Sequence, residues 1–172
     1  MDCLEIMYTR RSIRRYSNQI PEESLIEELI HAGMMAPSAG NQQPWHFITV
    51  KDSAMLHKIT EINPYAKMAA EAPAGILVCG DTRVERFPGN WVQDCSAAIQ
   101  NILLAAHAKG LGAVWTGVFP EEDRMVGFQK AFKLPQGVIP QAFIVLGYPR
   151  DEAKTAPVPH RIQPERIHKE TW

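Results

Sequence analysis

The sequence predicts a layered α/β fold, in which apolar strands are separated by helices. Three apolar runs of strand length, at 74–80, 113–118 and 141–148, are separated by segments whose apolar residues recur at helical spacing. A chain of 172 residues, 45% of them hydrophobic and 22% charged, is long enough and apolar enough to bury a core. We therefore expect one domain over residues 1–172, with strands and helices packed in layers.

The first half of the chain predicts three helices and two strands. A short helix at the start ends near a cluster of arginines, and a second helix begins at Pro21. Residues 46–50 predict a strand, and Asp52 or Ser53 caps a third helix. The continuous apolar run over 74–80 is typical of a central strand that is buried on both faces.

The second half predicts a loop over 82–90 and a long helix over about 91–109, which Gly110 stops. Apolar residues cover most of the circumference of this helix, so we expect it to be buried on nearly every side and shared with a second subunit. Residues 121–133 predict a further helix. The polar, proline-rich segment 149–172 predicts a C-terminal tail that packs around a partner subunit.

Charge and cysteine content exclude several classes of protein. A net charge of -1 gives no general attraction to nucleic acid or to an anionic membrane. The three cysteines form no C-x-x-C pair, which argues against a disulfide framework and for a reducing compartment. We see no secretory signal and no apolar stretch near the ~20 residues that span a bilayer, so we expect a cytoplasmic protein. The six histidines show no ligand spacing, and we predict no metal site.

Two segments together suit one anionic, ring-bearing ligand. Residues 10–14 read Arg-Arg-Ser-Ile-Arg, and their guanidinium groups and hydroxyl suit a phosphate group. Residues 37–45 combine prolines, a glycine and short polar side chains, which predicts a stiff turn with unpaired donors and acceptors. The alternatives are an exposed basic loop and an ordinary helix-to-strand turn. Together the segments predict a phosphorylated, planar cofactor such as flavin mononucleotide (FMN).

Five motifs in one order along the chain are those of a known family. They are residues 10–16 (RRSIRRY), 36–45 (APSAGNQQPW), 72–81 (APAGILVCGD), 100–106 (QNILLAA) and 110–117 (GLGAVWTG). Any one of these motifs is weak evidence, but all of them in this order are specific, and the likeness runs from about residue 3 to residue 172. The chain resembles the FMN-dependent nitroreductase family, and its small bacterial or archaeal branch most closely.

The resemblance implies a three-layer fold with a central mixed β-sheet flanked by helices, in an intertwined homodimer with FMN at the subunit interface. It implies an oxidoreductase that takes a hydride from NADH or NADPH onto FMN. The electrons then pass by a ping-pong mechanism to a nitroaromatic, a quinone or a related small molecule. In such an enzyme the cofactor carries the redox chemistry, and the protein supplies placement and electrostatics.

The resemblance also implies which residues contact the cofactor. Residues 10–14 would bind the phosphate and ribityl chain, and Arg161 would return from the tail to the phosphate. Arg14 or Lys67 would stabilise the negative charge of the reduced ring, and no side chain need act as a nucleophile. The turn would meet the ring edge from the other subunit. The expected contacts are Arg10, Arg11, Ser12, Arg14, Pro37, Ser38, Ala39, Asn41, Lys67, Trp115, Thr116, Gly117 and Arg161.

Two other interpretations stay open. The first is another flavin-dependent activity of the family, such as dehalogenation, flavin fragmentation or dehydrogenation of a metabolite. Members of that kind usually carry additional segments over the flavin, whereas the loop over 82–90 is short. The second is a module without enzyme activity that binds nucleic acid or a protein partner through residues 10–15. The near-neutral net charge of the chain disfavours this interpretation. The sequence leaves open whether the hydride donor is NADH or NADPH, and whether Arg83 and Arg86 contact that donor.

Overall fold

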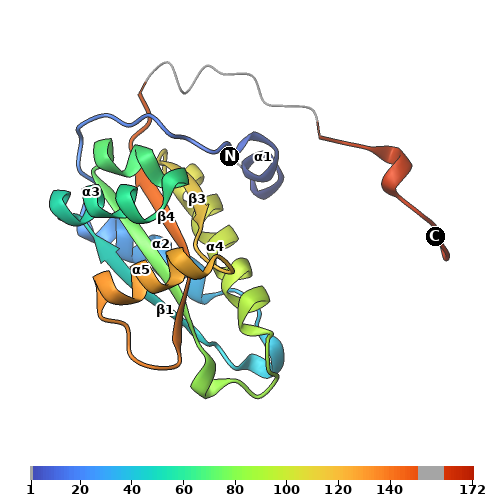
Figure 1. The fold of residues 1–172 in the computed structure, drawn as a ribbon. Coiled ribbons are helices and arrows are strands. Elements are labelled where there is room, and N and C mark those ends of the chain that lie inside the picture. Colours follow the sequence, from blue (N-terminus) through green and yellow to red (C-terminus); the bar gives the residue numbers. More distant parts are fainter. Residues whose placement is uncertain (1, 151–160) are drawn as a thin grey trace.

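The computed structural model describes residues 2–150 and 161–172 and has the layered α/β fold that the sequence predicts (Figure 1). Its strands are β1 (Trp45–Val50), β2 (Ala74–Asp81), β3 (Gly112–Gly117) and β4 (Val138–Gly147). Its α-helices are α1 (Cys3–Thr9), α2 (Glu23–Met34), α3 (Ser53–Ile62), α4 (Trp91–Ala108) and α5 (Glu122–Phe132). Short 3-10 segments are η1 (Ala39–Asn41), η2 (Pro64–Glu71), η3 (Thr82–Val84) and η4 (Pro164–Arg166).

The four strands form one sheet in the order β1-β2-β4-β3, and each neighbouring pair is antiparallel. A parallel contact comes from the arginine-rich segment, because Ser12 forms an isolated bridge with Ala113 on the free edge of β3. The mixed sheet that the family resemblance implies is therefore an antiparallel sheet with one short parallel addition. β1 and β3 are its two outer strands.

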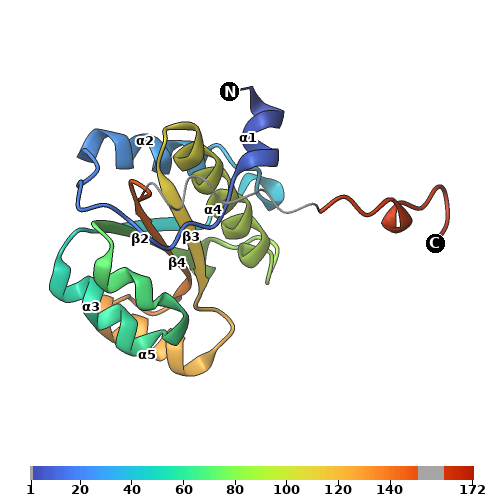
Figure 2. The same ribbon diagram turned by 90° about the horizontal axis from the view of Figure 1, so that it is seen from above.

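Helices cover both faces of the sheet, as Figure 2 shows. α1, α2 and α4 lie on one side, and α3 and α5 lie on the other. Side chains of β2 alternate between the two cores: Ile76 packs in the core with α2 and α4, and Leu77 packs in the core with α3 and α5. Because every residue of β2 is buried, this strand is a continuous apolar run in the sequence.

Two helix ends follow the capping groups that the sequence predicts, whereas α2 begins at Glu23 and not at Pro21. Asp52 caps α3 by accepting a hydrogen bond from the backbone N–H of Met55 at 2.8 Å. Gly110, just past α4, has a φ of 76°, the left-handed conformation that favours glycine. Lys67 lies on the 3-10 segment η2, whose geometry is interrupted at Ala66.

One side of α4 packs against the sheet and α2, and the opposite side does not. Ile99 and Ile102 are fully buried, whereas Gln93 and Gln100 are exposed and Leu104 is half-buried. The sequence predicts a helix enclosed on nearly every side, and a single chain encloses α4 only in part. None of the described helices is long and apolar enough to cross a membrane.

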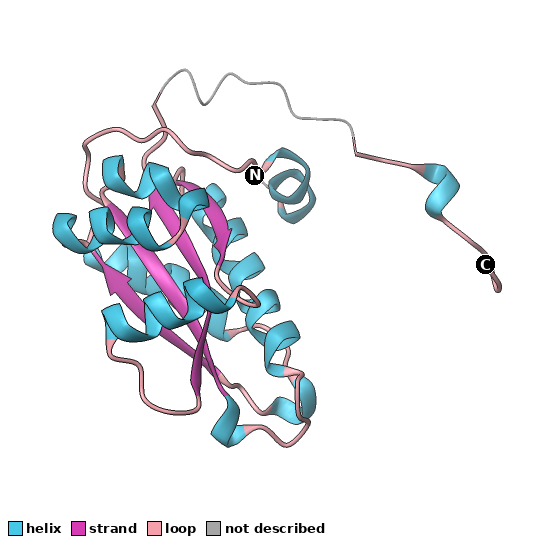
Figure 3. Cartoon of the chain, viewed as in Figure 1, coloured by secondary structure: helices cyan, strands magenta, loops and turns pink. Residues whose placement is uncertain are grey.

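The start of the predicted tail is held against the N-terminal segment. The backbone N–H of Ser17 donates to the carbonyl of Tyr148 at 2.8 Å, and the N–H of Arg150 donates to the carbonyl of Arg15 at 3.2 Å. Residues 151–160 of the tail lie outside the described residues. Residues 161–172 are exposed and extend away from the helices and strands (Figure 3).

Candidate functional site

The arginine segment, residues 10–14, runs beside β3. The backbone N–H of Ile13 donates to the carbonyl of Ala113 at 3.1 Å, next to the bridge between Ser12 and Ala113. The close approach requires a glycine at 112, because a Cβ there would lie 2.6 Å from the Cβ of Ile13. Within the segment, the exposed side chains are Ser12 and Arg14, and the half-buried side chains are Arg10 and Arg11.

Positive charge gathers around Arg10. Burial, and then the neighbouring charge of Arg161, lower the pKa of the Arg10 guanidinium below its ordinary value. Burial, and then the charge of Arg10, lower the pKa of His107 in turn. The charge of Arg161 in the tail thus acts on Arg10, and its expected contact with the phosphate stays a prediction. A bound anion would relieve this repulsion.

His107 joins α4 to the end of α1. Its Nε2 lies 2.8 Å from the Oγ1 of Thr9, and the Thr9 hydroxyl donates to the carbonyl of Glu5 at 2.6 Å. Because a hydroxyl has a single hydrogen to donate, His107 Nε2 is the donor in its contact with Thr9. This contact places the arginine segment, which begins at residue 10, at the C-terminal end of α4.

Trp115, Thr116 and Gly117 form the second half of β3, and Gly117 lies ~13 Å along the strand from Ala113. Thr116 is buried, and its hydroxyl donates to the carbonyl of Phe143 at 2.7 Å, so its side chain is used within the sheet. Trp115 is half-buried and packs against the core shared with α4. The Thr116 hydroxyl is therefore engaged within the sheet, whereas Trp115 and Gly117 keep part of their surface exposed.

Gly117 is a glycine that the folded chain itself does not require. Every other glycine of the sequence either has a positive φ or would place a Cβ against a neighbouring atom. Gly117 has neither property, since an added Cβ would meet nothing within 4 Å. A backbone that must approach a ligand closely is a further common reason for glycine. Gly117 therefore faces open space, in which a ligand would meet no side chain of its own.

Lys67 belongs to the same edge of the sheet, because η2 lies beside β3. The Nδ2 of Asn63, at the start of η2, donates to the carbonyl of Gly117 at 3.1 Å. Lys67 is exposed four residues further along η2. One edge of the sheet thus gathers the arginine segment, the Lys67 segment and Gly117.

The turn over residues 37–43 is fixed to the N-terminal end of α4. Asp94 accepts hydrogen bonds from the backbone N–H of Ala39 at 2.9 Å and from the Nε2 of Gln42 at 2.7 Å. The Oγ of Ser38 accepts the N–H of Gln43 at 3.0 Å. Pro37 is exposed and so is Asn41, which has a left-handed φ of 55°.

One chain does not bring the turn and the arginine segment together. The turn leads into β1, which lies three strand spacings from β3, or ~14 Å across the sheet. Along α4, Asp94 beside the turn precedes His107 beside the arginine segment by about 13 residues, or ~20 Å. The residues that the sequence predicts to meet one cofactor therefore form two groups at opposite edges of the sheet.

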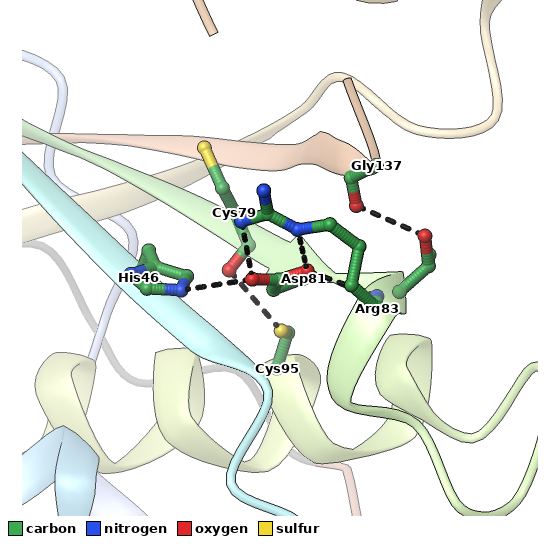
Figure 4. Close-up of polar contacts among 7 residues, drawn as sticks. His46, Cys79, Asp81, Arg83, Cys95 and Gly137 are labelled. Carbon is green, nitrogen blue, oxygen red and sulfur yellow. Dashed lines mark hydrogen bonds and ion pairs between the residues drawn. The ribbon is translucent and has the colours of Figure 1, made fainter. Parts of the chain in front are cut away.

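The loop over 82–90 begins at Asp81, which is not among the expected site residues. Asp81 accepts hydrogen bonds from the Nε of Arg83 at 2.8 Å and from its Nη2 at 2.7 Å, and lies 3.5 Å from His46 Nε2 (Figure 4). The hydrogen bonds from Arg83 are the main reason that the pKa of Asp81 falls to about 2. Arg83 is thus engaged by Asp81, and only the spacing Asp-x-Arg after an apolar strand signals this pair.

Two more side chains hold the rest of this loop. The Oε1 of Gln42 accepts the backbone N–H groups of Arg86 and Phe87 at 2.9 and 3.3 Å. The Oε1 of Glu85 accepts the N–H of Trp91 at 3.1 Å and that of Gly89 at 3.0 Å, which satisfies donors at the start of α4. The loop is therefore fixed at its beginning, middle and end.

The two buried cysteines offer no rival chemistry, and the described residues contain no cluster of metal ligands. Cys79 and Cys95 are buried, whereas Cys3 is exposed. Burial raises the pKa of the Cys79 thiol to about 12 and also raises that of Cys95, so neither is a ready nucleophile. Across residues 2–150 and 161–172, no group of three or more His, Cys, Asp or Glu side chains could hold a metal ion.

Comparisons with known proteins agree with the motifs. A model of the nitroreductase family matches residues 7–75 and 61–148. The "Putative NADH dehydrogenase/NAD(P)H nitroreductase" of Methanothermobacter thermautotrophicus is 51% identical, over 100% of this chain and 88% of its own length. A crystal structure with the same name from Parabacteroides distasonis has a TM-score of 0.93 and 40% identity, and covers 98% of both chains.

A further crystal structure includes a flavin. A "putative nitroreductase in complex with fmn" from Desulfovibrio desulfuricans has a TM-score of 0.82 and 28% identity, and the match covers 98% of this chain and 96% of that one. The fold, the order of the motifs and these likenesses agree. This chain belongs to the nitroreductase family.

Proposed function

We propose that the protein is an FMN-dependent oxidoreductase. It takes a hydride from NADH or NADPH and reduces a nitroaromatic, a quinone or a related small molecule by a ping-pong mechanism. The observation that carries the proposal is the edge of the sheet along β3, which has an arginine segment at one end and the open Gly117 at the other. Membership of the nitroreductase family supports the reaction class, and the FMN complex of the Desulfovibrio relative supports the cofactor.

The residues along this edge fit the two ends of FMN. Arg10, Ser12 and Arg161 would hold the phosphate, since guanidinium and hydroxyl groups are strong donors to phosphate oxygens. The charge of Arg161 already lowers the pKa of Arg10, so a dianion between them would remove an unfavourable interaction. Gly117 would let the flat ring approach the backbone closely.

Positive side chains on this edge can also adjust the cofactor. When bound, FMN supplies the redox chemistry. Arg14 and Lys67 are exposed on two segments that lie beside β3, and either cation would stabilise negative charge that develops on a reduced ring. No nucleophile or general base of the chain is needed, and the buried thiols of Cys79 and Cys95 take no part.

A second copy of the chain would complete each site. The turn that carries Pro37, Ser38, Ala39 and Asn41 lies at the opposite edge of the sheet, so it would reach the ring from a partner subunit. Surfaces suited to such a partner are present. Leu4, Met7 and Tyr8 form an exposed apolar stripe along α1, and α4 is enclosed only on one side. The tail over 149–172 would pack around the partner.

The fixed loop over 82–90 favours an acceptor that enters an open site. Asp81, Gln42 and Glu85 hold it, and it adds only the short segment η3. It supplies no long segment that would enclose a large, specific substrate. A generic reductase of small planar acceptors therefore fits this chain better than the more specialised flavin activities.

The test is the visible spectrum of the purified protein. We expect a yellow protein whose flavin absorbance bleaches when NADH or NADPH is added without oxygen, and returns with a nitroaromatic or quinone. The faster pyridine nucleotide identifies the donor. Light scattering on the same sample should give the mass of a dimer. A colourless protein that takes up no FMN, or a monomer that binds FMN fully, would contradict the proposal.

A further inference from the structure

Asn63 joins two elements that the proposed site uses. It is fully buried between α3 and η2, where its Oδ1 accepts the backbone N–H of Tyr65 at 3.0 Å. Its Nδ2 donates to the carbonyl of Gly117, 54 residues further along the chain, at 3.1 Å. A buried amide is costly unless its polar atoms are paired, and here both ends of the side chain are paired. Asn63 therefore fixes the start of η2 relative to the end of β3.

Arg124 of α5 reinforces the same contact from the surface. Its Nη1 donates to the carbonyl of Gly117 at 3.3 Å, and its guanidinium carbon lies 4.9 Å from the centre of the Tyr65 ring. The Tyr65 backbone is held by Asn63 and its ring by Arg124. These four residues thus form a closed set of contacts among η2, β3 and α5.

The contacts leave the peptide group after Gly117 no freedom to rotate. A carbonyl oxygen has two lone pairs, and the carbonyl of Gly117 receives donors from both Asn63 and Arg124. The N–H at the other end of the same peptide group, that of Val118, donates to the carbonyl of Gln141 at 3.1 Å. All the hydrogen-bonding positions of this peptide are therefore occupied, beside a Cα whose open side meets nothing within 4 Å.

We infer that Asn63 and Arg124 are positioning residues for hydride transfer. They hold the Gly117 peptide, and through η2 the Lys67 segment, in place against the ring of the cofactor. The inference rests on the proposed function, because it requires the ring to lie on Gly117. Its weight comes from geometry, since a misplacement of ~1 Å at a reacting centre can cost ~100-fold in rate.

Two variants test the two donors separately. Asn63→Ser keeps a hydroxyl that can accept the N–H of Tyr65, as serine does at helix starts, but it is too short to reach Gly117. Arg124→Gln removes the guanidinium from a half-buried position without opening the core, and the glutamine amide is two bonds too short to take the place of Nη1. The matched control is Lys130→Gln, which removes one positive charge from the exposed part of the same helix.

The measurement is the rate of flavin reduction in FMN-loaded protein, followed by stopped flow without oxygen at saturating NADH or NADPH. We expect the flavin of each variant to be reduced ~10-fold more slowly. Because a misplacement of ~1 Å costs ~100-fold, a ~10-fold loss corresponds to a displacement well under 1 Å. The FMN Kd should stay within about twofold of wild type, because the phosphate contacts are untouched. The visible band of the bound flavin should shift in both variants, and Lys130→Gln should match wild type throughout.

Two results would overturn the inference. One is a wild-type reduction rate in Arg124→Gln, and the other is slow reduction that only follows a loss of FMN. If Asn63→Ser fails to fold, Arg124→Gln decides alone, because it leaves the core intact. Failure of the proposed function looks different, since wild-type protein would then bind no FMN before any variant is made.

Discussion

The buried side chain of Gln42 donates a hydrogen bond to Asp94 at 2.7 Å, and this contact ties the turn before β1 to α4. The other oxygen of Asp94 accepts the backbone N–H of Ala39. The remaining atom of the Gln42 amide, Oε1, accepts the N–H groups of Arg86 and Phe87. The turn, α4 and the loop over 82–90 therefore form one rigid unit, whose position is set by two polar side chains.

Asp94→Asn should destabilise the fold, because the new amide would direct an N–H group at a donor. We expect the free energy of unfolding to fall by ~1–3 kcal/mol, the usual result of leaving a buried polar group unpaired. Urea denaturation measures the change. As a control, Glu28→Gln breaks only a surface ion pair with Lys109 and should cost less than ~1 kcal/mol. Equal effects of the two substitutions would show that the contact with Gln42 is unimportant.

Gly117→Ala should separate folding from cofactor binding. Its Cβ would enter open space and its φ is not positive, so the free energy of unfolding should be unchanged or rise by up to ~1 kcal/mol. The FMN Kd should rise ~10-fold or more, a loss of ~1.4 kcal/mol, because the methyl group would push against the ring. Fluorescence titration with FMN and thermal melting of the apoprotein give the two numbers.

Gly112→Ala is the contrasting substitution on the same strand. A Cβ at this position would lie 2.6 Å from the Cβ of Ile13, so the arginine segment must move away from β3. We expect a loss of ~1–3 kcal/mol in stability, as for other overpacked sites. If Gly117→Ala destabilises the apoprotein as much as Gly112→Ala does, the open surface at Gly117 does not exist in solution.

Arg14→Ala should weaken FMN retention and lower the reduction potential of the flavin. The guanidinium is exposed beside β3, where it would stabilise a negatively charged reduced ring. A loss of ~1.4 kcal/mol of this stabilisation corresponds to a fall of ~30 mV for a two-electron couple. Equilibration with a reference dye measures the potential, and Lys130→Ala, at an exposed position of α5, serves as the control. An unchanged potential in a variant that still holds FMN would contradict the role of the Arg14 charge.

Arg10→Gln should raise the pKa of His107. Burial is the first cause of the lowered pKa of His107 and the charge of Arg10 is the second, so the shift should be relieved only in part. NMR titration of the His107 ring in the apoprotein tests this expectation. Addition of FMN to wild type should raise the same pKa, since the phosphate would offset the Arg10 charge. If the pKa of His107 responds neither to Arg10→Gln nor to FMN, Arg10 lies away from both His107 and the phosphate.

Asp81→Asn should remove a stabilisation that depends on pH. The hydrogen bonds from Arg83 lower the pKa of Asp81 from 3.8 to about 2, so the folded state favours the ionised carboxylate. The stabilisation is therefore complete above about pH 4 and is lost as the pH falls through about 2. Urea denaturation at several pH values should show a difference between wild type and Asp81→Asn at pH 5 that shrinks below about pH 4. A difference that is constant across this range would assign the effect to packing.

The sequence predicts the elements of this fold well but not how the strands pair. Each strand is visible as an apolar run because it is buried, and Asp52 and Gly110 mark helix ends by local chemistry. Strand direction has no such local signal. Helix-containing connections usually join parallel strands. Here α3 and η2 lie between β1 and β2, which nevertheless pair antiparallel.

The residues of the candidate site also fall into those that the sequence predicts and those that it does not. The sequence predicts residues 10–14 because their side-chain chemistry is recognisable within a short motif. It predicts Gly117 because the residue lacks a side chain and lies within a similar short motif. It does not predict Asn63 and Gln42, because each acts through a partner more than 40 residues away, at Gly117 and at Arg86. An isolated Asn or Gln between two elements is most often a simple turn residue, and only the folded chain shows that these two are buried.

The placement of the turn and the arginine segment at opposite edges of the sheet has a genetic consequence. If each pocket takes its arginines from one chain and its turn from the other, two variants that are damaged in different segments should rescue each other. A mixed pair with Arg14→Ala in one chain and a damaged turn in the other would keep one intact pocket of its two. Two alleles that damage the same segment would leave none.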